Sequence, residues 1–180
     1  MVGGSARGRT LVAPPGERTR PTSDRVREAI FNALVSRDAV AGARVLDVFA
    51  GSGALGIEAL SRGAAHATFV DSDRAARQAV RRNLEACGFL DRADIVAAPA
   101  ERYLGGLRAG RVDAEHAAEF DLAFCDPPYA FGGWEGLLAS LPAGLVVIES
   151  DGPVAVPAGW ALVRESRYGG TWVGFARRAD

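Results

Sequence analysis

Short apolar runs alternate with amphipathic stretches along most of the chain, and this rhythm predicts strands that alternate with helices. Strands are expected at residues 45–49, 67–70, 95–97, 120–125, 145–149, 160–164 and 171–177. Helices are expected after Ser23 and Asp73 and at residues 54–62, 101–107 and 134–141. This order predicts an α/β fold in which a mostly parallel, seven-stranded sheet carries helices on both faces. The last two strands, joined by Tyr168-Gly169-Gly170, predict a hairpin that adds one antiparallel edge strand.

The first helix is indicated by a clear apolar stripe. Thr22 or Ser23 is the expected N-cap, and one face then collects Val26, Ala29, Ile30, Ala33 and Leu34. Arg25, Arg27 and Glu28 are expected on its other faces. Residues 1–20, which are rich in Gly, Arg and Pro, predict a short basic arm or hairpin, and residues 21–180 predict a single domain.

The charge is distributed unevenly. All 21 basic residues are arginine, and residues 1–37 hold seven of them against three acidic residues, a net charge of +4. The other 143 residues carry 14 arginines against 19 acidic residues, a net charge of -5. One interpretation is that the genome favours arginine codons, which would explain the missing lysine, and that the basic terminus is merely solvated. The position of the excess favours an anionic partner such as nucleic acid.

Composition excludes several classes of protein. The chain is 48% hydrophobic and 24% charged, which is typical of a globular protein. No apolar run approaches the ~20 residues of a membrane helix. The cysteines, Cys87 and Cys125, fit neither a disulfide framework nor a metal site, and His66 and His116 are the only histidines. We therefore expect a cytoplasmic, soluble monomer without a metal ion.

A glycine-rich loop predicts a nucleoside-containing ligand. Residues 51–56 read Gly-Ser-Gly-Ala-Leu-Gly between a predicted strand and helix, and Asp71 follows Gly51 by 20 residues. Such a loop lets a ligand approach the backbone, and the acid accepts ribose hydroxyls. NAD and S-adenosylmethionine both fit. Asp47 favours the latter, since a carboxylate would repel pyrophosphate and suit an ammonium group. Alternatively, Asp47 only binds loop amides and Asp71 only caps a strand.

The tetrapeptide Asp126-Pro127-Pro128-Tyr129 follows a buried strand and suits methylation of an exocyclic amine. Such a nitrogen is a poor nucleophile because its lone pair is conjugated with the base. The Asp126 carboxylate and the Pro127 carbonyl could accept its N–H groups and free the lone pair. Two prolines fix the backbone, and Tyr129 offers a ring on which a base could stack. A simple strand-ending turn is the alternative.

Together these runs resemble the RsmD-type family of bacterial 16S rRNA guanine-N2 methyltransferases, which are class I S-adenosylmethionine-dependent enzymes. The resemblance covers nearly the whole chain and rests on Gly3-Gly4, Arg7-Gly8-Arg9, residues 20–28, Phe31-Asn32, residues 46–56, residues 58–64 and residues 126–129. It implies a Rossmann-like class I methyltransferase fold, S-adenosylmethionine as cofactor, and 16S rRNA or the small ribosomal subunit as partner.

The resemblance also implies roles for individual residues. The methionine end of the donor would be lined by Asp47, Ala50, Gly51, Ser52 and Gly53. Asp71 would hold the ribose, Ser72 would border the adenine, and the guanine amine would be held by Asp126, Pro127, Pro128 and Tyr129. RNA would contact Arg7, Arg9, Arg18, Arg20 and Thr22. Relatives often place Asn or Asp after the third strand to bind the adenine, whereas this chain reads Ala97-Ala98-Pro99-Ala100.

Three alternative functions remain open. A DNA adenine or cytosine amino-methyltransferase would share the tetrapeptide, although this chain leaves no room for a separate target-recognition domain. A nonenzymatic RNA-binding assembly factor would need neither the tetrapeptide nor the glycine-rich loop. A nicotinamide-linked oxidoreductase would use the loop but has no evident use for the tetrapeptide.

Overall fold

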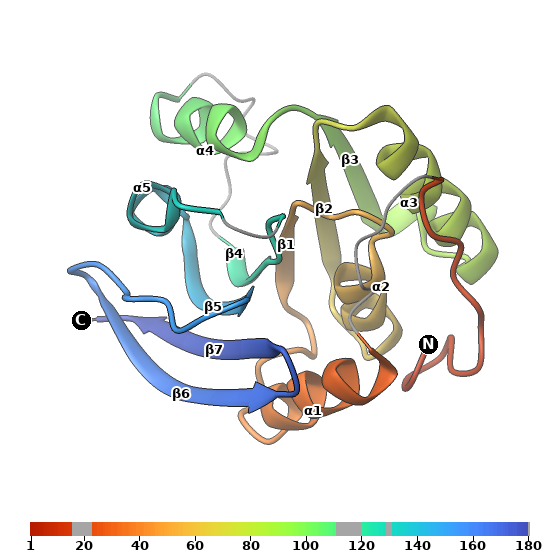
Figure 1. The fold of residues 1–180 in the computed structure, drawn as a ribbon. Helices are drawn as coiled ribbons and strands as arrows, with labels where there is room; N and C mark the ends of the chain where they lie inside the picture. Colours follow the sequence, from red (N-terminus) through yellow and green to blue (C-terminus); the bar gives the residue numbers. More distant parts are fainter. Residues whose placement is uncertain (16–22, 111–119, 129–130, 180) are drawn as a thin grey trace.

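The computed structural model describes residues 1–15, 23–110, 120–128 and 131–179, and its seven strands form one sheet in the order β3-β2-β1-β4-β5-β7-β6 (Figure 1). The strands are β1 (Arg44–Val48), β2 (His66–Asp71), β3 (Ala93–Ala97), β4 (Phe120–Cys125), β5 (Ala143–Ser150), β6 (Trp160–Tyr168) and β7 (Thr171–Arg178). The helices are α1 (Asp24–Val35), α2 (Ala54–Ser61), α3 (Arg74–Cys87), α4 (Ala100–Arg108) and α5 (Trp134–Ser140), with a 3-10 turn η1 (Leu90–Arg92). All predicted strands and helices are present. Within the described ranges, no helix is long and apolar enough to cross a membrane.

The direction of the strands confirms the predicted class of fold. Parallel pairing joins β3 to β2, β2 to β1, β1 to β4, and β4 to β5. The predicted hairpin closes one edge of the sheet: β7 pairs antiparallel with β5, and β6 pairs antiparallel with β7 as the outermost strand. Strand order reverses between β1 and β4, and in open α/β sheets ligands bind at the carboxyl ends of the strands beside such a reversal.

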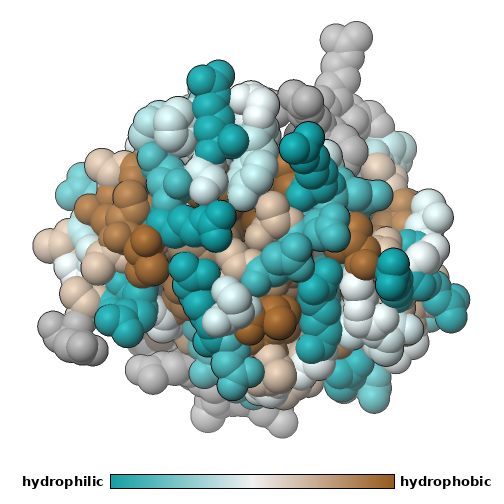
Figure 2. All heavy atoms as spheres, turned by 90° about the horizontal axis from the view of Figure 1, so that it is seen from below, coloured by the Kyte–Doolittle hydropathy of each residue, from teal (hydrophilic) through white to brown (hydrophobic). Residues whose placement is uncertain are grey.

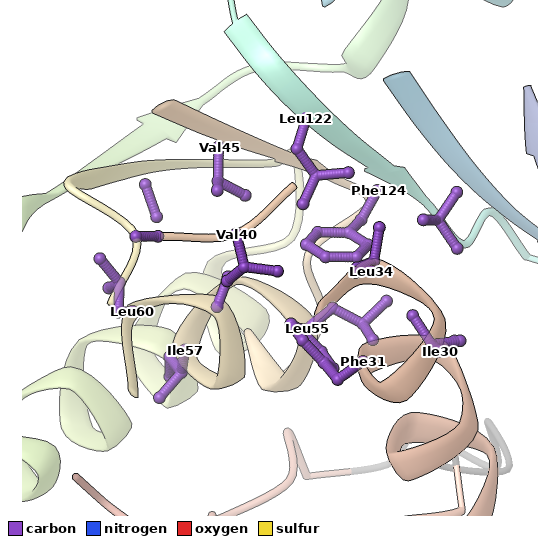
Figure 3. Packing of buried hydrophobic residues seen from close by; sticks show 14 of the residues in the cluster. Ile30, Phe31, Leu34, Val40, Val45, Leu55, Ile57, Leu60, Leu122 and Phe124 are labelled. Atoms are coloured by element: carbon purple, nitrogen blue, oxygen red, sulfur yellow. The ribbon is translucent and has the colours of Figure 1, made fainter. Parts of the chain in front are cut away.

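Helices cover both faces of the sheet, as predicted, because side chains along each strand alternate between two cores. One core packs α1, α2 and α3 against residues such as Val45 and Phe124 (Figure 3). The other packs α4 and α5 against residues such as Leu46 and Val70. Seen from below, the surface carries hydrophilic side chains with small hydrophobic patches between them (Figure 2). The apolar side chains of the two cores hold the helices to the sheet.

The arm is docked on the body of the protein over its described residues, 1–15, which form turns and no strand. Ser61, at the end of α2, donates from Oγ to the Gly3 carbonyl at 2.6 Å and accepts there from the Ala6 amide at 2.9 Å. Gly4 has φ +71°, and a Cβ atom on it would lie 1.8 Å from the Ser61 carbonyl oxygen. Only glycine therefore fits this approach of two backbones.

The prediction that Arg27 lies on an outer face of α1 is wrong. Arg27 is 7% exposed, forms an ion pair with Asp24, and has its Nε atom 4.0 Å from Oε2 of Glu58. Glu58 is fully buried and also accepts from Arg62 Nε at 2.7 Å and from the Val2 amide at 3.0 Å. A buried carboxylate needs cations and donors, and Glu58 has two guanidinium groups beside it, those of Arg27 on α1 and of Arg62 directly after α2.

We predict that Glu58→Ala destabilises the fold by about 3–5 kcal/mol, because the buried Arg27 would keep only the exposed Asp24 as a carboxylate partner and Arg62 would lose its ion pair. Urea denaturation measures the change in free energy of unfolding. Glu85→Ala, at an exposed position on α3, is the control. A loss below about 1 kcal/mol for Glu58→Ala would show that water replaces the carboxylate at no great cost.

Candidate active site

The loop from β1 into α2 has a backbone that few residues tolerate. Left-handed φ angles occur at Phe49 (61°), Gly51 (55°) and Gly53 (75°), and Gly53 is the N-cap of α2. The Gly53 amide donates to the Ala50 carbonyl at 2.7 Å, which closes the turn. Phe49 is the informative residue because a bulky side chain in this region is strained, and such strain is typical of functional loops. The sequence pattern did not predict this strained residue.

Asp71 ties this loop to the carboxyl end of β2. One carboxylate oxygen accepts from the Gly51 amide at 2.9 Å, and the other accepts from the Asp73 amide at 2.8 Å. Asp73 in turn caps α3, and the exposed Ser72 lies between them. Each Asp71 oxygen has a second lone pair, so the half-buried carboxylate can still accept from hydroxyl groups of a ligand. Its predicted contact with a ribose stays a prediction.

Asp47 is a buried acid directly behind the loop. It is 2% exposed, and Oδ2 accepts from the Gly56 amide in the first turn of α2 at 2.9 Å. Burial raises the pKa of Asp47 to about 8, against the lowering effect of this hydrogen bond, and the charges of Asp126 and Asp71 raise it further. Asp71 at the end of β2 and Asp126 directly after β4 therefore both act on Asp47 of β1 at a single edge of the sheet. The proposed contact with a donor ammonium group stays a prediction.

The structure explains why position 56, the third glycine of the motif, needs a glycine. A Cβ atom there would lie 2.4 Å from the Phe69 ring and 3.0 Å from Asp47 Oδ2. The missing side chain lets α2 pack closely on β2 and lets its amide reach Asp47. The motif thus serves both the packing of the helix and the placement of the acid.

Asp126, Pro127 and Pro128 follow β4 at the same edge. The last residue of β4, Cys125, is in register with Val48 of β1 and Ile148 of β5, so the tetrapeptide begins beside the glycine-rich loop. Asp126 and Pro128 are exposed and Pro127 is buried. Tyr129 lies outside the described residues. Burial raises the pKa of the Cys125 thiol, and the charges of Asp47 and Asp126 raise it further, which favours the neutral thiol over the thiolate.

Aromatic side chains connect the loop to α5. The Phe49 and Phe131 ring centroids are 5.5 Å apart, and those of Phe131 and Trp134 are 5.2 Å apart, both edge to face. Phe131, shortly after the tetrapeptide, therefore packs against the strained Phe49 and is itself packed against Trp134 of α5. No spacing rule in the sequence connects positions 49, 131 and 134, so this cluster was not predicted.

The remaining predicted site residues are placed only in part. Arg7 and Arg9 are exposed on the docked arm, whereas Arg18, Arg20 and Thr22 lie outside the described residues. After β3, Pro99 precedes α4 as its N-cap without a side-chain hydrogen bond. Within the described ranges, no group of three or more His, Cys, Asp or Glu side chains is arranged to hold a metal ion.

Strand order, the loop after β1 and the acid at the end of β2 define a Rossmann-like class I methyltransferase. The family described as "Conserved hypothetical protein 95" matches residues 1–177. The chain belongs to this family, the RsmD-type family of rRNA methyltransferases.

Individual relatives agree over nearly the whole chain. "Ribosomal RNA small subunit methyltransferase D" of Escherichia coli K12 is 38% identical over 179 residues, which cover 94% of this chain and 84% of the relative. The solved structure of yhhF from Escherichia coli, 37% identical, covers 99% of this chain and 96% of its own, with a TM-score of 0.81. A solved hypothetical protein of Thermus thermophilus, TTHA0928, is 33% identical and covers 97% of this chain and 96% of its own, with a TM-score of 0.78.

The raised pKa of Asp47 predicts a pH dependence of stability. Its value of about 8 lies above the ordinary 3.8, so the folded protein keeps a proton that the unfolded chain releases. The free energy of unfolding should therefore fall as the pH rises from about 4 to about 8. Asp47→Asn removes this titration and keeps an oxygen acceptor for Gly56.

Urea denaturation at a series of pH values, for parent and variant, measures the effect. The fall with pH should be clearly steeper in the parent than in Asp47→Asn. Asp91→Asn, at an exposed position on η1, should follow the parent. Equal pH slopes for parent and Asp47→Asn would mean that Asp47 is ionised in the folded protein at neutral pH.

Proposed function

We propose that this protein transfers a methyl group from S-adenosylmethionine to the exocyclic N2 amine of a guanine in 16S rRNA. The observation that carries the proposal is the position of Asp126-Pro127-Pro128 directly beside the glycine-rich loop, at the point where strand order reverses. Membership of the RsmD-type family supports the same substrate. In this reaction the glycine-rich loop would bind the methyl donor, and the tetrapeptide would hold the amine that receives the methyl group.

The residues around the loop fit the donor chemically. Asp71 has lone pairs left for ribose hydroxyls. Ser72, the next residue, would border the adenine. Ala50, Gly51, Ser52 and Gly53 leave room for close approach of the methionine end. When bound, the donor supplies an electrophilic methyl group on a sulfonium. A sulfonium and an ammonium are cations, which suit the acidic groups Asp71 and Asp126 at this edge and would favour ionisation of the buried Asp47 between them.

Asp126 and the Pro127 carbonyl are the proposed partners of the target amine. Accepting its two N–H groups reduces conjugation of the nitrogen with the base and leaves the lone pair free to attack. Pro127 and Pro128 have fixed φ angles and donate no backbone hydrogen bond, so the acceptors keep their direction. Tyr129 would stack on the base, which must be unpaired or flipped out to reach this edge.

The docked arm is the proposed RNA contact. Arg7 and Arg9 are exposed on it, and its amino-terminal half is held on α2 by Ser61. Arg18, Arg20 and Thr22 follow in sequence. Arginine side chains bind phosphates without reading the base, so this segment would give affinity and leave the choice of nucleotide to the tetrapeptide.

We predict that Asp126→Ala slows methyl transfer by a factor on the order of 10²–10⁴ at saturating donor and RNA, since Asp126 acts mainly in the transition state. Asp126→Asn keeps one oxygen acceptor and should lose less. Single-turnover kinetics on 16S rRNA from cells that lack the gene gives the rates, and mass mapping of the product gives the modified base. Asp91→Ala is the control.

Two results would contradict the proposal. An Asp126→Ala rate within about threefold of the parent would remove Asp126 from the reaction. Methylation of DNA, or of an RNA base other than guanine, would keep the enzyme class and overturn the proposed substrate.

Calorimetry with S-adenosylhomocysteine and with NAD distinguishes a methyltransferase from a nicotinamide-linked oxidoreductase. Binding of NAD alone would overturn the methyltransferase assignment for this chain.

The arm makes a separate prediction about salt. If Arg7, Arg9, Arg18 and Arg20 all bind phosphates, replacing them by alanine should flatten the slope of log K against log salt by roughly 3–4 units. The control replaces Arg37 and Arg177, which are also exposed but do not belong to the arm. Parallel lines for the parent and the fourfold variant would mean that these arginines stay solvated and that RNA binds elsewhere.

A further inference from the structure

Asn83 on α3 connects the arm to the glycine-rich loop. Its side chain is buried, with 1% of the residue exposed. Oδ1 accepts from the Val12 amide at 2.8 Å, and Nδ2 donates to the Val12 carbonyl at 2.9 Å. The same Nδ2 donates to the Ser52 carbonyl at 2.8 Å. One amide group thus joins residues that are 31 and 71 positions away in the sequence.

The chemistry of the three partners makes this connection specific. Asparagine offers one oxygen acceptor and two N–H donors, and here it faces one backbone N–H and two carbonyls. Only one orientation of the amide satisfies all three groups. Aspartate could not donate to either carbonyl, and an apolar residue would leave buried backbone groups without a partner. Loss of one partner therefore affects both the arm and the loop.

On the loop side, Asn83 holds the peptide between the two left-handed glycines. The Gly51 amide is held by Asp71 and the Gly53 amide by the Ala50 carbonyl, so the Ser52 carbonyl is the third fixed point. These are the residues proposed to line the methionine end of the donor. A shift of the Ser52 peptide would change the shape of that site.

On the arm side, Asn83 holds the far end of the segment that carries the exposed arginines. Ala6 is bound to Ser61 at the end of α2, and Val12 is bound to Asn83. Arg7 and Arg9 lie between these two points. Because this segment is bound to α2 at one end and to α3 at the other, a displacement of its backbone changes the contact with Asn83.

We propose that Asn83 is a positioning residue that couples binding of RNA on the arm to binding of the methyl donor in the loop. The inference rests on the proposed function. Contacts that hold the arm on RNA favour the Val12–Asn83 pairing, and this pairing favours the loop shape that binds the donor. Coupling of this kind is reciprocal, so the donor strengthens RNA binding by the same factor.

The test compares Val12→Pro with Val12→Ala. Proline removes the Val12 amide donor and leaves Asn83 and the loop unchanged in sequence, whereas alanine keeps both backbone bonds and shortens only an exposed side chain. Calorimetry measures the Kd of S-adenosylhomocysteine with and without saturating 16S rRNA. In the parent, RNA should tighten this Kd about fivefold or more. Val12→Ala should keep that factor, and Val12→Pro should reduce it to within about twofold of one.

Asn83→Ala tests the same contact from the other side and should also abolish the tightening of the S-adenosylhomocysteine Kd by RNA. A purely structural role would lower the midpoint of denaturation and leave the ratio of the two Kd values as in the parent. An unchanged ratio in Val12→Pro and Asn83→Ala would overturn the proposal. So would a ratio of one in a parent that binds both ligands and methylates RNA, a result that leaves the proposed function intact.

Discussion

The site depends on a backbone that would not keep its shape alone. Between β1 and α2 the chain must turn within a few residues, and it does so with left-handed φ angles at Phe49, Gly51 and Gly53. Glycine adopts these angles at little cost, but Phe49 does not. The surrounding structure must therefore supply the missing free energy. The rest of the carboxyl edge can be understood as the set of contacts that supplies it.

Those contacts come from three different elements. Asp47 of β1 binds the first turn of α2, Asp71 at the end of β2 binds the Gly51 amide, and Asn83 of α3 binds the Ser52 carbonyl. Two of the three are carboxyl groups, and the charge of Asp71 adds to the burial that raises the pKa of Asp47. The same groups that fix the loop thus leave an electronegative edge, which favours a cationic ligand and opposes a pyrophosphate.

The sequence was sufficient for the order and type of the elements because strand and helix periodicity, the Asp73 cap and the Gly88 stop are local signals. It was insufficient where a residue's role depends on a distant partner. Arg27 follows the polar pattern of α1, and only the buried Glu58 shows why it is enclosed. Asn83 reads as one polar residue on a helix until Val12 and Ser52 are brought to it by the fold. The order of β7 and β6 at the edge likewise depends on pairing that no local pattern encodes.

If the docked arm binds RNA as proposed, it resolves an electrostatic conflict in the proposed reaction. Carboxyl groups at the edge suit a cationic donor, but they repel the phosphates of the RNA that must approach the same place. Fixed at Ser61 and at Asn83, the arm runs from the end of α2 to the glycine-rich loop and carries Arg7 and Arg9 along that path. Because its backbone is already ordered, RNA binding there costs less conformational entropy than binding by a free tail. Arg7 and Arg9 follow Ala6, which is bound at the carboxyl-terminal end of α2, whereas the acidic site lies where α2 begins. This positive charge could therefore attract phosphates without neutralising the carboxyl groups that would receive the donor.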